Sequence, residues 1–397
     1  MAKRNSRTKR SIRRKAQAKV DKAQDESLPV LDSLTELPAF ADLRPSEAQL
    51  DAFADYRAEV LAREGDDAEL DLGCVVRLDR GFPAVLTRRD VFRAEFAARL
   101  TKGDFSRVAV GDWVCVRNPK GHEMGVIEKI LPRQSDIARW KGGSRGERQT
   151  LAANVDVVLV VQALEEWRIT SGRIARSAVV ARDCGARVAV VLTKADLAGA
   201  ELVESSVKHV REVLGGDCRV SVVASADTST DLSPIAAATE RAGGSWGVES
   251  VRSLVPHGQV GIMLGPSGVG KSTLLNALLG REALQTGAVR ESDGVGRHTT
   301  VARRMVAIPK AGVIVDEPGL RTLQLVGHER GLAMAFPDIA QAARECKFRD
   351  CTHTHEPGCE VQARFGGETS NVRLDTYLSL ANEMRESAQT LDPDIVL

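Results

Sequence analysis

Short, almost unbroken apolar runs recur along the middle of the chain. They lie at 155–161, 188–192, 220–224, 260–264 and 313–315, and helical patterns such as 201–214 and 272–280 separate several of them. Apolar strands that alternate with helices are typical of a parallel sheet buried on both faces. The pattern therefore predicts an α/β domain over 150–328, with its chemistry at the carboxyl ends of the strands.

The segments on either side of this domain have different patterns. Between 72 and 135, short apolar runs separated by turn residues predict a small antiparallel β-barrel, and periodicity alone fits an OB-fold and an SH3-like barrel equally well. Residues 329–397 have a helical pattern that is interrupted by cysteines and histidines. Residues 1–71 have no sustained strand pattern, so we expect them to be largely disordered or partly helical, with one acidic amphipathic helix over 47–63.

Charge is distributed unevenly, although the 397 residues carry a net charge of only +1. Residues 1–20 hold nine Lys or Arg and no acid, whereas residues 32–71 hold twelve Asp or Glu and three Arg. A basic arm of this kind often binds RNA, and the alternative is a solvated tail without a partner. No apolar run approaches the length of a membrane-spanning helix or forms a signal-peptide core. We therefore expect a cytoplasmic protein without a membrane partner.

A phosphate-binding loop follows the apolar run at 260–264 and precedes a helical pattern. Its motif is Gly265-x4-Gly270-Lys271-Ser272, whose backbone N–H groups would surround phosphates at the start of a helix. Lys271 would neutralise β- and γ-phosphate oxygens, and the Ser272 hydroxyl would bind magnesium. We expect the nucleotide to be held by Gly265, Pro266, Ser267, Gly268, Val269, Gly270, Lys271, Ser272 and Thr273. This loop alone does not choose between ATP and GTP.

The choice of base comes from Thr193-Lys194-Ala195-Asp196, which follows the run at 188–192. The Asp196 carboxylate can accept from both N1–H and the exocyclic amine of guanine, a donor pair that adenine does not have. Lys194 would lie along the ring face. A backbone N–H of Ser225 or Ala226, after the next apolar run, would meet guanine O6. An isolated Lys-x-Asp is common, and its alternative interpretation is an exposed loop pair.

The magnesium side of the site is predicted at the end of the run at 313–315. Asp316 would hold magnesium through water, and Gly319 would offer its N–H to the γ-phosphate. The Gly-rich segment 294–300 has the composition of a mobile switch, in which Thr299 or Thr300 would complete the magnesium shell.

The catalytic water needs a group to orient it. Leu320 occupies the position where many GTPases carry a water-orienting Gln, and an aliphatic side chain cannot do this. We expect His298 to take this role, with Lys271 as the second catalytic residue, because a neutral imidazole can accept or relay a proton. The alternative is that His298 is a solvent-exposed or RNA-facing loop histidine.

The order of these motifs is unusual. In an ordinary GTPase the Lys-x-Asp element comes last, whereas here Lys194 precedes the loop that contains Lys271. The sequence therefore predicts a circularly permuted GTPase domain. The permutation places the switch segments directly before the C-terminal segment.

The C-terminal cluster has the spacing Cys346-x4-Cys351-x-His353-x5-Cys359. Three thiolates and one imidazole make a full tetrahedral set for a structural zinc ion, which would fold the local segment. Coincidental clustering is the alternative, and His355 could replace His353 as the ligand. The remaining cysteines are scattered in apolar contexts typical of buried or inert thiols; they are Cys74, Cys115, Cys184 and Cys218.

Three features lead to a known family: the permuted motif order, the barrel that precedes it, and the sequence Cys-Lys-Phe-Arg-Asp-Cys-Thr-His-Thr-His-Glu-Pro-Gly-Cys at 346–359. Together they resemble the RsgA (YjeQ) family of bacterial small-ribosomal-subunit biogenesis GTPases. The resemblance covers roughly 70–385. Two departures stand out. Thr193 replaces a frequent Asn, which would shorten or remove an amide contact to the base, and Glu317 adds a negative charge where Thr or Ser is usual.

The resemblance implies an N-terminal OB-fold, a permuted GTPase domain and a C-terminal helical zinc domain. It also implies that the protein docks on the 30S subunit and hydrolyses GTP slowly until that subunit stimulates it late in maturation. We further expect a monomer that binds GTP and GDP with Mg²⁺ and contacts 16S rRNA. Two alternatives are a GTPase acting on another ribosomal or RNA target and a GTP-gated rRNA clamp whose hydrolysis is incidental.

Overall fold

The computed structural model describes residues 36–65, 69–79, 82–100, 108–118, 124–141, 147–164, 169–224, 231–282, 303–316, 325, 327–367 and 371–391. The chain divides into two units, Met1–Glu36 and Leu37–Leu397, and the second contains the fold described below. The basic arm at 1–20 lies outside the described residues.

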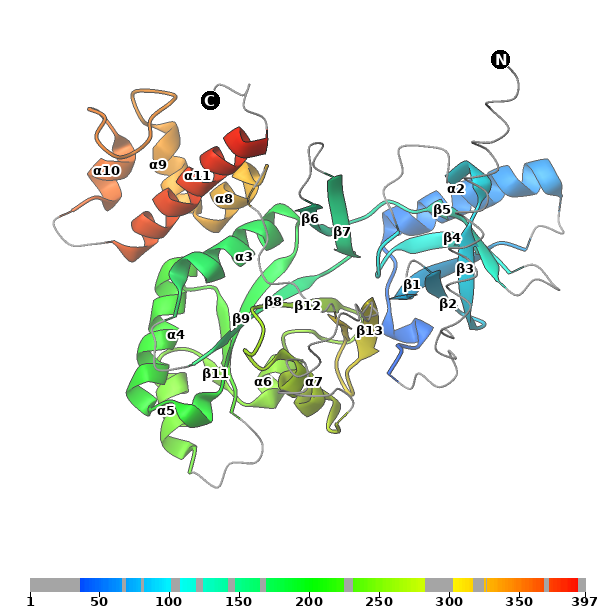
Figure 1. The fold of residues 1–397 in the computed structure, drawn as a ribbon, viewed down its shortest axis with the longest axis horizontal. Coiled ribbons are helices and arrows are strands. Elements are labelled where there is room, and N and C mark those ends of the chain that lie inside the picture. The colour runs from blue at the N-terminus through cyan, green and yellow to red at the C-terminus, as the bar shows by residue number, and fades with distance from the viewer. Residues whose placement is uncertain are drawn as a thin grey trace, which may run out of the picture. The chain divides into compact units, whose positions relative to one another are not determined.

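A closed five-stranded barrel forms the amino-terminal part of this unit (Figure 1). Its strands are β1 (Asp71–Asp79), β2 (Phe82–Thr87), β3 (Val91–Phe96), β4 (Trp113–Arg117) and β5 (Gly125–Ile130). β1 pairs with β2 and with β4, which closes the barrel, and every neighbouring pair is antiparallel except β3 with β5. Branched aliphatic side chains such as Val75, Val85 and Ile127 fill the interior. Of the two barrel types that periodicity allowed, the OB-fold is the one found.

The acidic helix predicted at 47–63 is α2 (Glu47–Glu64). Ser46 caps it, because the hydroxyl accepts from the backbone N–H of Gln49 while Gln49 accepts from the backbone N–H of Ser46. Tyr56 and Val60 are buried, and the Tyr56 hydroxyl donates to Glu128 of β5 at 2.7 Å. The helix therefore packs on the barrel through an apolar face.

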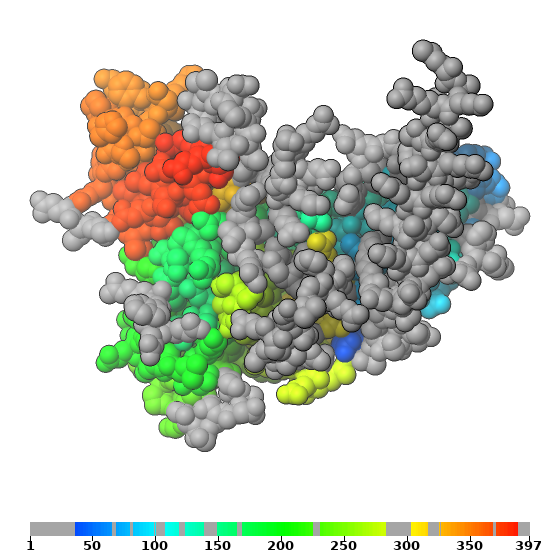
Figure 2. Space-filling view, in the orientation of Figure 1, coloured from blue at the N-terminus to red at the C-terminus, as the bar shows by residue number. Residues whose placement is uncertain are grey.

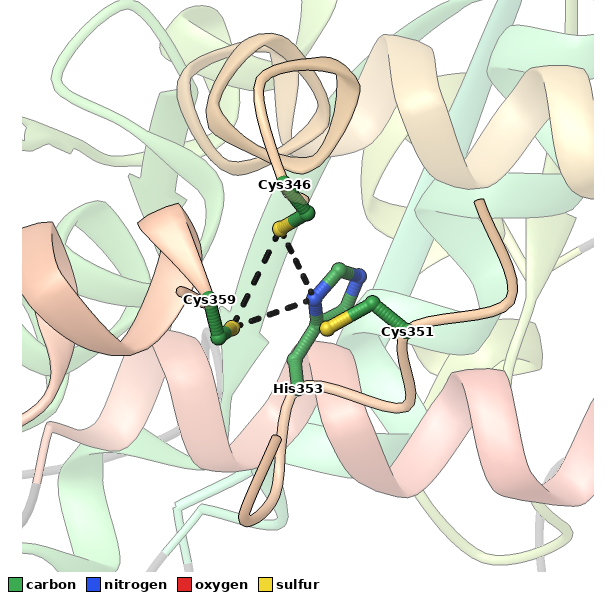
Figure 3. Close-up of side chains that lie close together, drawn as sticks. All are labelled: Cys346, Cys351, His353 and Cys359. Atoms are coloured by element: carbon green, nitrogen blue, oxygen red, sulfur yellow. Dashed lines mark hydrogen bonds between the residues drawn. The ribbon is translucent and has the colours of Figure 1, made fainter. Parts of the chain in front are cut away.

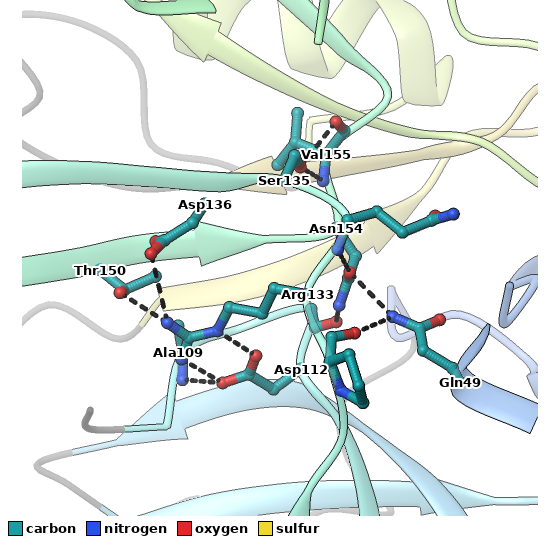
Figure 4. Close-up of polar contacts among 12 residues, drawn as sticks. Gln49, Ala109, Asp112, Arg133, Ser135, Asp136, Thr150, Asn154 and Val155 are labelled. Carbon is teal, nitrogen blue, oxygen red and sulfur yellow. Dashed lines mark hydrogen bonds and ion pairs between the residues drawn. The ribbon is translucent and has the colours of Figure 1, made fainter. Parts of the chain in front are cut away.

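A hairpin that the sequence pattern did not predict follows the barrel in the chain and precedes the first strand of the central sheet. It consists of β6 (Asp136–Lys141) and β7 (Glu147–Ala153). Figure 4 shows the polar contacts at its base, where the Arg133 guanidinium donates to both oxygens of Asp112 at 2.7 and 2.8 Å and to the Thr150 hydroxyl at 2.8 Å. The Asn154 amide adds a bond to the Gly111 carbonyl and accepts from Gln49. These bonds join α2, the barrel and the hairpin.

The predicted parallel sheet is present, in the order β11-β10-β9-β8-β12-β14-β13. Only β13 runs antiparallel to its neighbour within this part of the sheet. The strands are β8 (Val157–Ala163), β9 (Arg187–Thr193), β10 (Arg219–Val222), β11 (Ser245–Trp246), β12 (Val260–Leu264), β13 (Arg303–Ala307) and β14 (Val313–Asp316). β13 also pairs with β1 of the barrel, so one sheet continues from the α/β domain into the barrel.

Helices cover both faces of this sheet. They are α3 (Ser171–Asp183), α4 (Ala200–Leu214), α5 (Ser233–Arg241), α6 (Val248–Arg252) and α7 (Lys271–Leu279). In β8, Val158 and Val160 pack in the same cluster as α3 and α4, whereas Leu159 and Val161 pack in the cluster that contains α7. Alternate residues of one strand are thus buried on opposite faces, which explains its unbroken apolar sequence.

The C-terminal part is helical, as predicted, with α8 (Glu329–Ala335), α9 (Pro337–Arg344), α10 (Glu360–Phe365) and α11 (Val372–Leu391). A Cβ on Gly331 would lie 2.3 Å from the Val179 carbonyl oxygen, so glycine permits close packing of α8 on α3. Arg373 of α11 donates to the Val213 carbonyl of α4 at 2.5 Å. In Figure 2 the orange and red surface of these helices adjoins the green surface of α3 and α4. Among the described helices, none is long and apolar enough to cross a membrane.

Candidate functional site

The loop between β12 and α7 has a backbone that requires glycine. Gly268 and Gly270 have φ values of +83° and +92°, in the left-handed region that L side chains rarely adopt. A Cβ on Gly265 would lie 2.4 Å from the Val161 carbonyl oxygen of β8. The loop therefore lies against the neighbouring strand and leads directly to the N-terminus of α7, and a helix N-terminus favours an anion.

Lys271 lies across this loop. Its ammonium donates to the carbonyl oxygens of Gly265 and Pro266, at 2.6 and 2.8 Å. The positive charge of Lys271 therefore lies at the start of α7, where the helix dipole adds to the attraction for a bound anion. This combination fits the phosphate groups of a nucleotide.

Thr193 connects the base motif to the phosphate loop. It ends β9, is only 4% exposed, and its hydroxyl donates to the Val269 carbonyl oxygen at 2.6 Å. The sequence predicts only a shortened or lost contact between this side chain and the base. In the structure its hydroxyl bonds to the phosphate loop, a contact between residues 76 positions apart that spacing does not reveal.

The rest of the base motif lies at the carboxyl ends of β9 and β10. Lys194 has a φ of 60°, which turns the chain into the short helix η4 (Ala195–Leu197) that contains Asp196. Buried Ala195 donates its backbone N–H to the Val223 carbonyl oxygen at 3.1 Å. Because β9, β8 and β12 are adjacent and parallel, the base motif and the phosphate loop share one edge of the sheet.

Asp316 ends β14 at the same edge, next to β12. Its Oδ2 lies 3.7 Å from Nε of Arg304 on β13, a partner that sequence reasoning did not identify because no strand was predicted at 303–307. Ser272 is the second residue of α7. A hydroxyl and a carboxylate are hard oxygen ligands, which suit Mg²⁺.

Several predicted site residues lie outside the described part of the chain. They are Ser225, Ala226, His298, Thr299, Thr300 and Gly319, together with Glu317 and Leu320.

The predicted metal ligands come together in the C-terminal part, as Figure 3 shows. Cys346 Sγ lies 3.6 Å from His353 Nδ1 and 3.9 Å from Cys359 Sγ, and Cys359 Sγ lies 3.5 Å from the same nitrogen. All four ligand atoms, including that of Cys351, lie within 4.8 Å of one another. A tetrahedral zinc ion with its usual bond lengths would place two sulfurs about 3.8 Å apart and a sulfur and a nitrogen about 3.6 Å apart. The cluster therefore fits zinc.

The local backbone presents His353 rather than His355 to the cluster. His353 has a φ of 61° and is nine-tenths buried, whereas His355 is exposed and its Nδ1 lies 2.8 Å from the Thr354 hydroxyl. Burial lowers the pKa of His353, which favours the neutral imidazole that a metal requires. Lys347 donates its backbone N–H to the Gly358 carbonyl at 3.1 Å, which closes the loop.

The connectivity of the sheet defines the class of protein. The base-motif strands β9 and β10 precede the phosphate-loop strand β12 in the chain but lie on one side of it, while β14 and β13 follow and lie on the other. A P-loop site with this strand order is that of a circularly permuted P-loop GTPase.

Comparison with known proteins agrees with this class. A family model described as RsgA GTPase matches residues 130–326. Small ribosomal subunit biogenesis GTPase RsgA of Streptomyces avermitilis is 37% identical over 332 residues, which is 83% of each chain, and that of Leptospira interrogans is 34% identical over 291 residues, covering 72% and 75%. The chain belongs to the RsgA family of ribosome biogenesis GTPases, and it is a GTP hydrolase.

Solved structures share the fold. YjeQ from Thermotoga maritima has a TM-score of 0.57 at 23% identity and covers 80% of this chain and 99% of its own. YloQ, described as a circularly permuted GTPase, has a TM-score of 0.55 at 21% identity and covers 82% and 98%. At these identities the likeness is one of fold.

We predict that Thr193→Val weakens GTP binding. The change removes the hydroxyl that anchors the Val269 carbonyl, so the phosphate loop loses a buried hydrogen bond, and affinity should fall about three- to tenfold. Fluorescence titration with a labelled GTP analogue measures this. Thr193→Ser should retain affinity.

Thr239→Val is the matched control, because its buried hydroxyl also donates to a carbonyl, that of Ile235, but within α5. Equal losses of affinity in Thr193→Val and Thr239→Val would argue against a specific link between base motif and phosphate loop.

We predict that Cys351→Ser loses the metal and unfolds the loop around it. Elemental analysis should show about one zinc ion per chain in the unaltered protein and almost none in the variant. GTP binding should persist, because the nucleotide motifs lie on other elements. Cys184→Ser is the control, since this thiol donates to the Asp136 carbonyl at 3.2 Å and a hydroxyl can do the same. Full zinc retention by Cys351→Ser would contradict the assignment.

Proposed function

We propose that this protein is a GTPase that binds the 30S ribosomal subunit late in its maturation and uses GTP hydrolysis to time its own release. The main support for the proposal is the hydrogen bond from the Thr193 hydroxyl to the Val269 carbonyl oxygen, which joins the base motif to the phosphate loop. Both motifs lie on a permuted sheet that continues into an OB barrel. Relatives at 37% and 34% identity that are named small ribosomal subunit biogenesis GTPases support the choice of target.

The nucleotide is held by both motifs. The loop 265–273, through its backbone N–H groups at positions other than Pro266, and the Lys271 ammonium bind the phosphates. Asp196 with Lys194 binds guanine, and Ser225 and Ala226 complete the base contact. Ser272, Asp316 and one of Thr299 and Thr300 hold Mg²⁺, which when bound neutralises charge on the phosphates. Gly319 contacts the γ-phosphate.

Water orientation is assigned to His298, because Leu320 cannot orient water. Lys271 contributes by stabilising the negative charge that develops on the phosphate oxygens. His298 and Lys271 act on bound GTP, and Asp196 provides the preference for guanine.

The metal is a single structural zinc ion bound by Cys346, Cys351, His353 and Cys359. It fixes the loop that carries Lys347, Phe348 and Arg349, in which Phe348 is 41% exposed and the Lys347 ammonium lies 5.4 Å from its ring centroid. An exposed aromatic ring beside cationic side chains is suited to stacking on an unpaired base.

Two further elements support an RNA partner. OB barrels bind oligonucleotides, and the barrel here joins the sheet on the side opposite to β11. The arm at 1–20 carries nine positive charges and no negative one, which favours contact with phosphates. We therefore propose 16S rRNA as the principal contact, a monomeric protein and a cytoplasmic location.

We predict that purified 30S subunits raise the multiple-turnover rate of GTP hydrolysis severalfold, whereas 50S subunits and ATP do not substitute. The physical reason is that Leu320 cannot orient water, so a partner that helps to position the catalytic groups lowers the barrier to hydrolysis. Phosphate release measured with each subunit tests this, with Lys271→Ala as the inactive control. Equal stimulation by 50S subunits would point to a different ribosomal target, and equal turnover of ATP would contradict the assignment of Asp196.

A further inference from the structure

Strand β13 has hydrogen-bonded neighbours on both edges. Arg304 is the direct cross-strand partner of Asp316 on β14 and also of Arg77 on β1 of the barrel. Directly opposed residues in antiparallel strands project from the same face, with Cβ atoms about 5 Å apart. Arg77, Arg304 and Asp316 therefore form one row that runs from the barrel to the magnesium side of the nucleotide site.

Each arginine of this row contacts a carboxylate. On the barrel side, Arg77 is buried and donates twice to Asp79, at 2.7 and 2.9 Å, while Arg93 contacts the same carboxylate at 2.6 Å. Burial opposes ionisation, but these two arginines hold the pKa of Asp79 below its ordinary value. On the other side, Nε of Arg304 lies 3.7 Å from Asp316 Oδ2.

The Arg304–Asp316 pair is partly shielded from water. The side chain of Arg304 is 18% exposed and that of Asp316 is 30% exposed. A shielded pair is screened less by salt and water than a surface pair, so the positive guanidinium raises the electrostatic potential at the Asp316 carboxylate. A second cation that approaches this carboxylate is repelled by the Arg304 guanidinium. It therefore binds Asp316 more weakly than it would if Arg304 were absent.

We propose that Arg304 competes with Mg²⁺ for Asp316, and that the pairing of β13 with β1 links this competition to the barrel. The inference rests on the proposed function, because it takes Asp316 as a magnesium-side residue. Arg304 is a positioning residue that lowers the magnesium affinity of the free protein. A barrel displaced by its RNA partner would move β13, and with it Arg304, relative to Asp316.

The test is a magnesium titration of labelled GDP and GTP-analogue binding, followed by fluorescence. Arg304→Gln should lower the half-saturating Mg²⁺ concentration by about three- to tenfold, because the competing charge is gone. Arg304→Lys, which keeps the charge, should stay near the unaltered protein. Thermal unfolding without nucleotide checks that each variant is folded.

Arg303→Gln is the matched control. It removes the same charge from the adjacent position of β13, which is paired with Leu78 and lies on the opposite face of the strand. This variant should leave the magnesium dependence unchanged. An equal shift in Arg303→Gln, or no shift in Arg304→Gln, would overturn the inference and leave the proposed function standing. If the unaltered protein binds guanine nucleotide without any magnesium dependence, the proposed magnesium site itself is wrong.

Discussion

The pairing of β13 with both β14 and β1 is the contact on which the arrangement of the site depends. It continues the sheet that carries the nucleotide motifs into the barrel. Because backbone hydrogen bonds join β13 to β1 as well as to β14, a movement of the barrel that carries β13 with it changes the position of Arg304 relative to Asp316. The magnesium side of the site and the OB barrel are therefore mechanically connected.

The permutation produces a second connection, at the other end of the α/β domain. Asp316 is followed after a short segment by α8, which begins at Glu329 and packs on α3. The Arg182 guanidinium of α3 donates to the Met334 and Ala335 carbonyls at the end of α8, at 3.0 and 3.1 Å. Chain connectivity thus leads from the nucleotide site to the metal-binding part, while sheet pairing leads to the barrel.

Features encoded by neighbouring residues could be predicted from the sequence. The apolar runs predicted the buried strands, because a strand such as β8 that is covered on both faces needs apolar residues at successive positions. The glycine spacing of 265–270 predicted a tight loop, and Gly268 and Gly270 have the positive φ values that such a loop requires. The cysteine spacing predicted a cluster that the fold brings together, although the choice between His353 and His355 required the backbone conformation.

The features that were missed depend on register between distant segments. β13 carries Arg303 and Arg304 beside Met305 and Val306, so half of it lacks the apolar signature of a strand. The bond from Thr193 to Val269 follows from the packing of β9 beside β8. The hairpin of β6 and β7 has apolar residues only in groups of three or fewer, and most of its other residues are polar. No local pattern contains this information.

Hydrogen exchange measured by mass spectrometry tests the link between nucleotide site and barrel most directly. The full-length protein would be compared with and without Mg²⁺ and a non-hydrolysable GTP analogue. We expect faster exchange in the β1 segment around Arg77 and Leu78 and in β13 when bound Mg²⁺ separates Asp316 from Arg304, and no change in β3. Unchanged or slower exchange in that segment of β1, with nucleotide bound, would contradict this link.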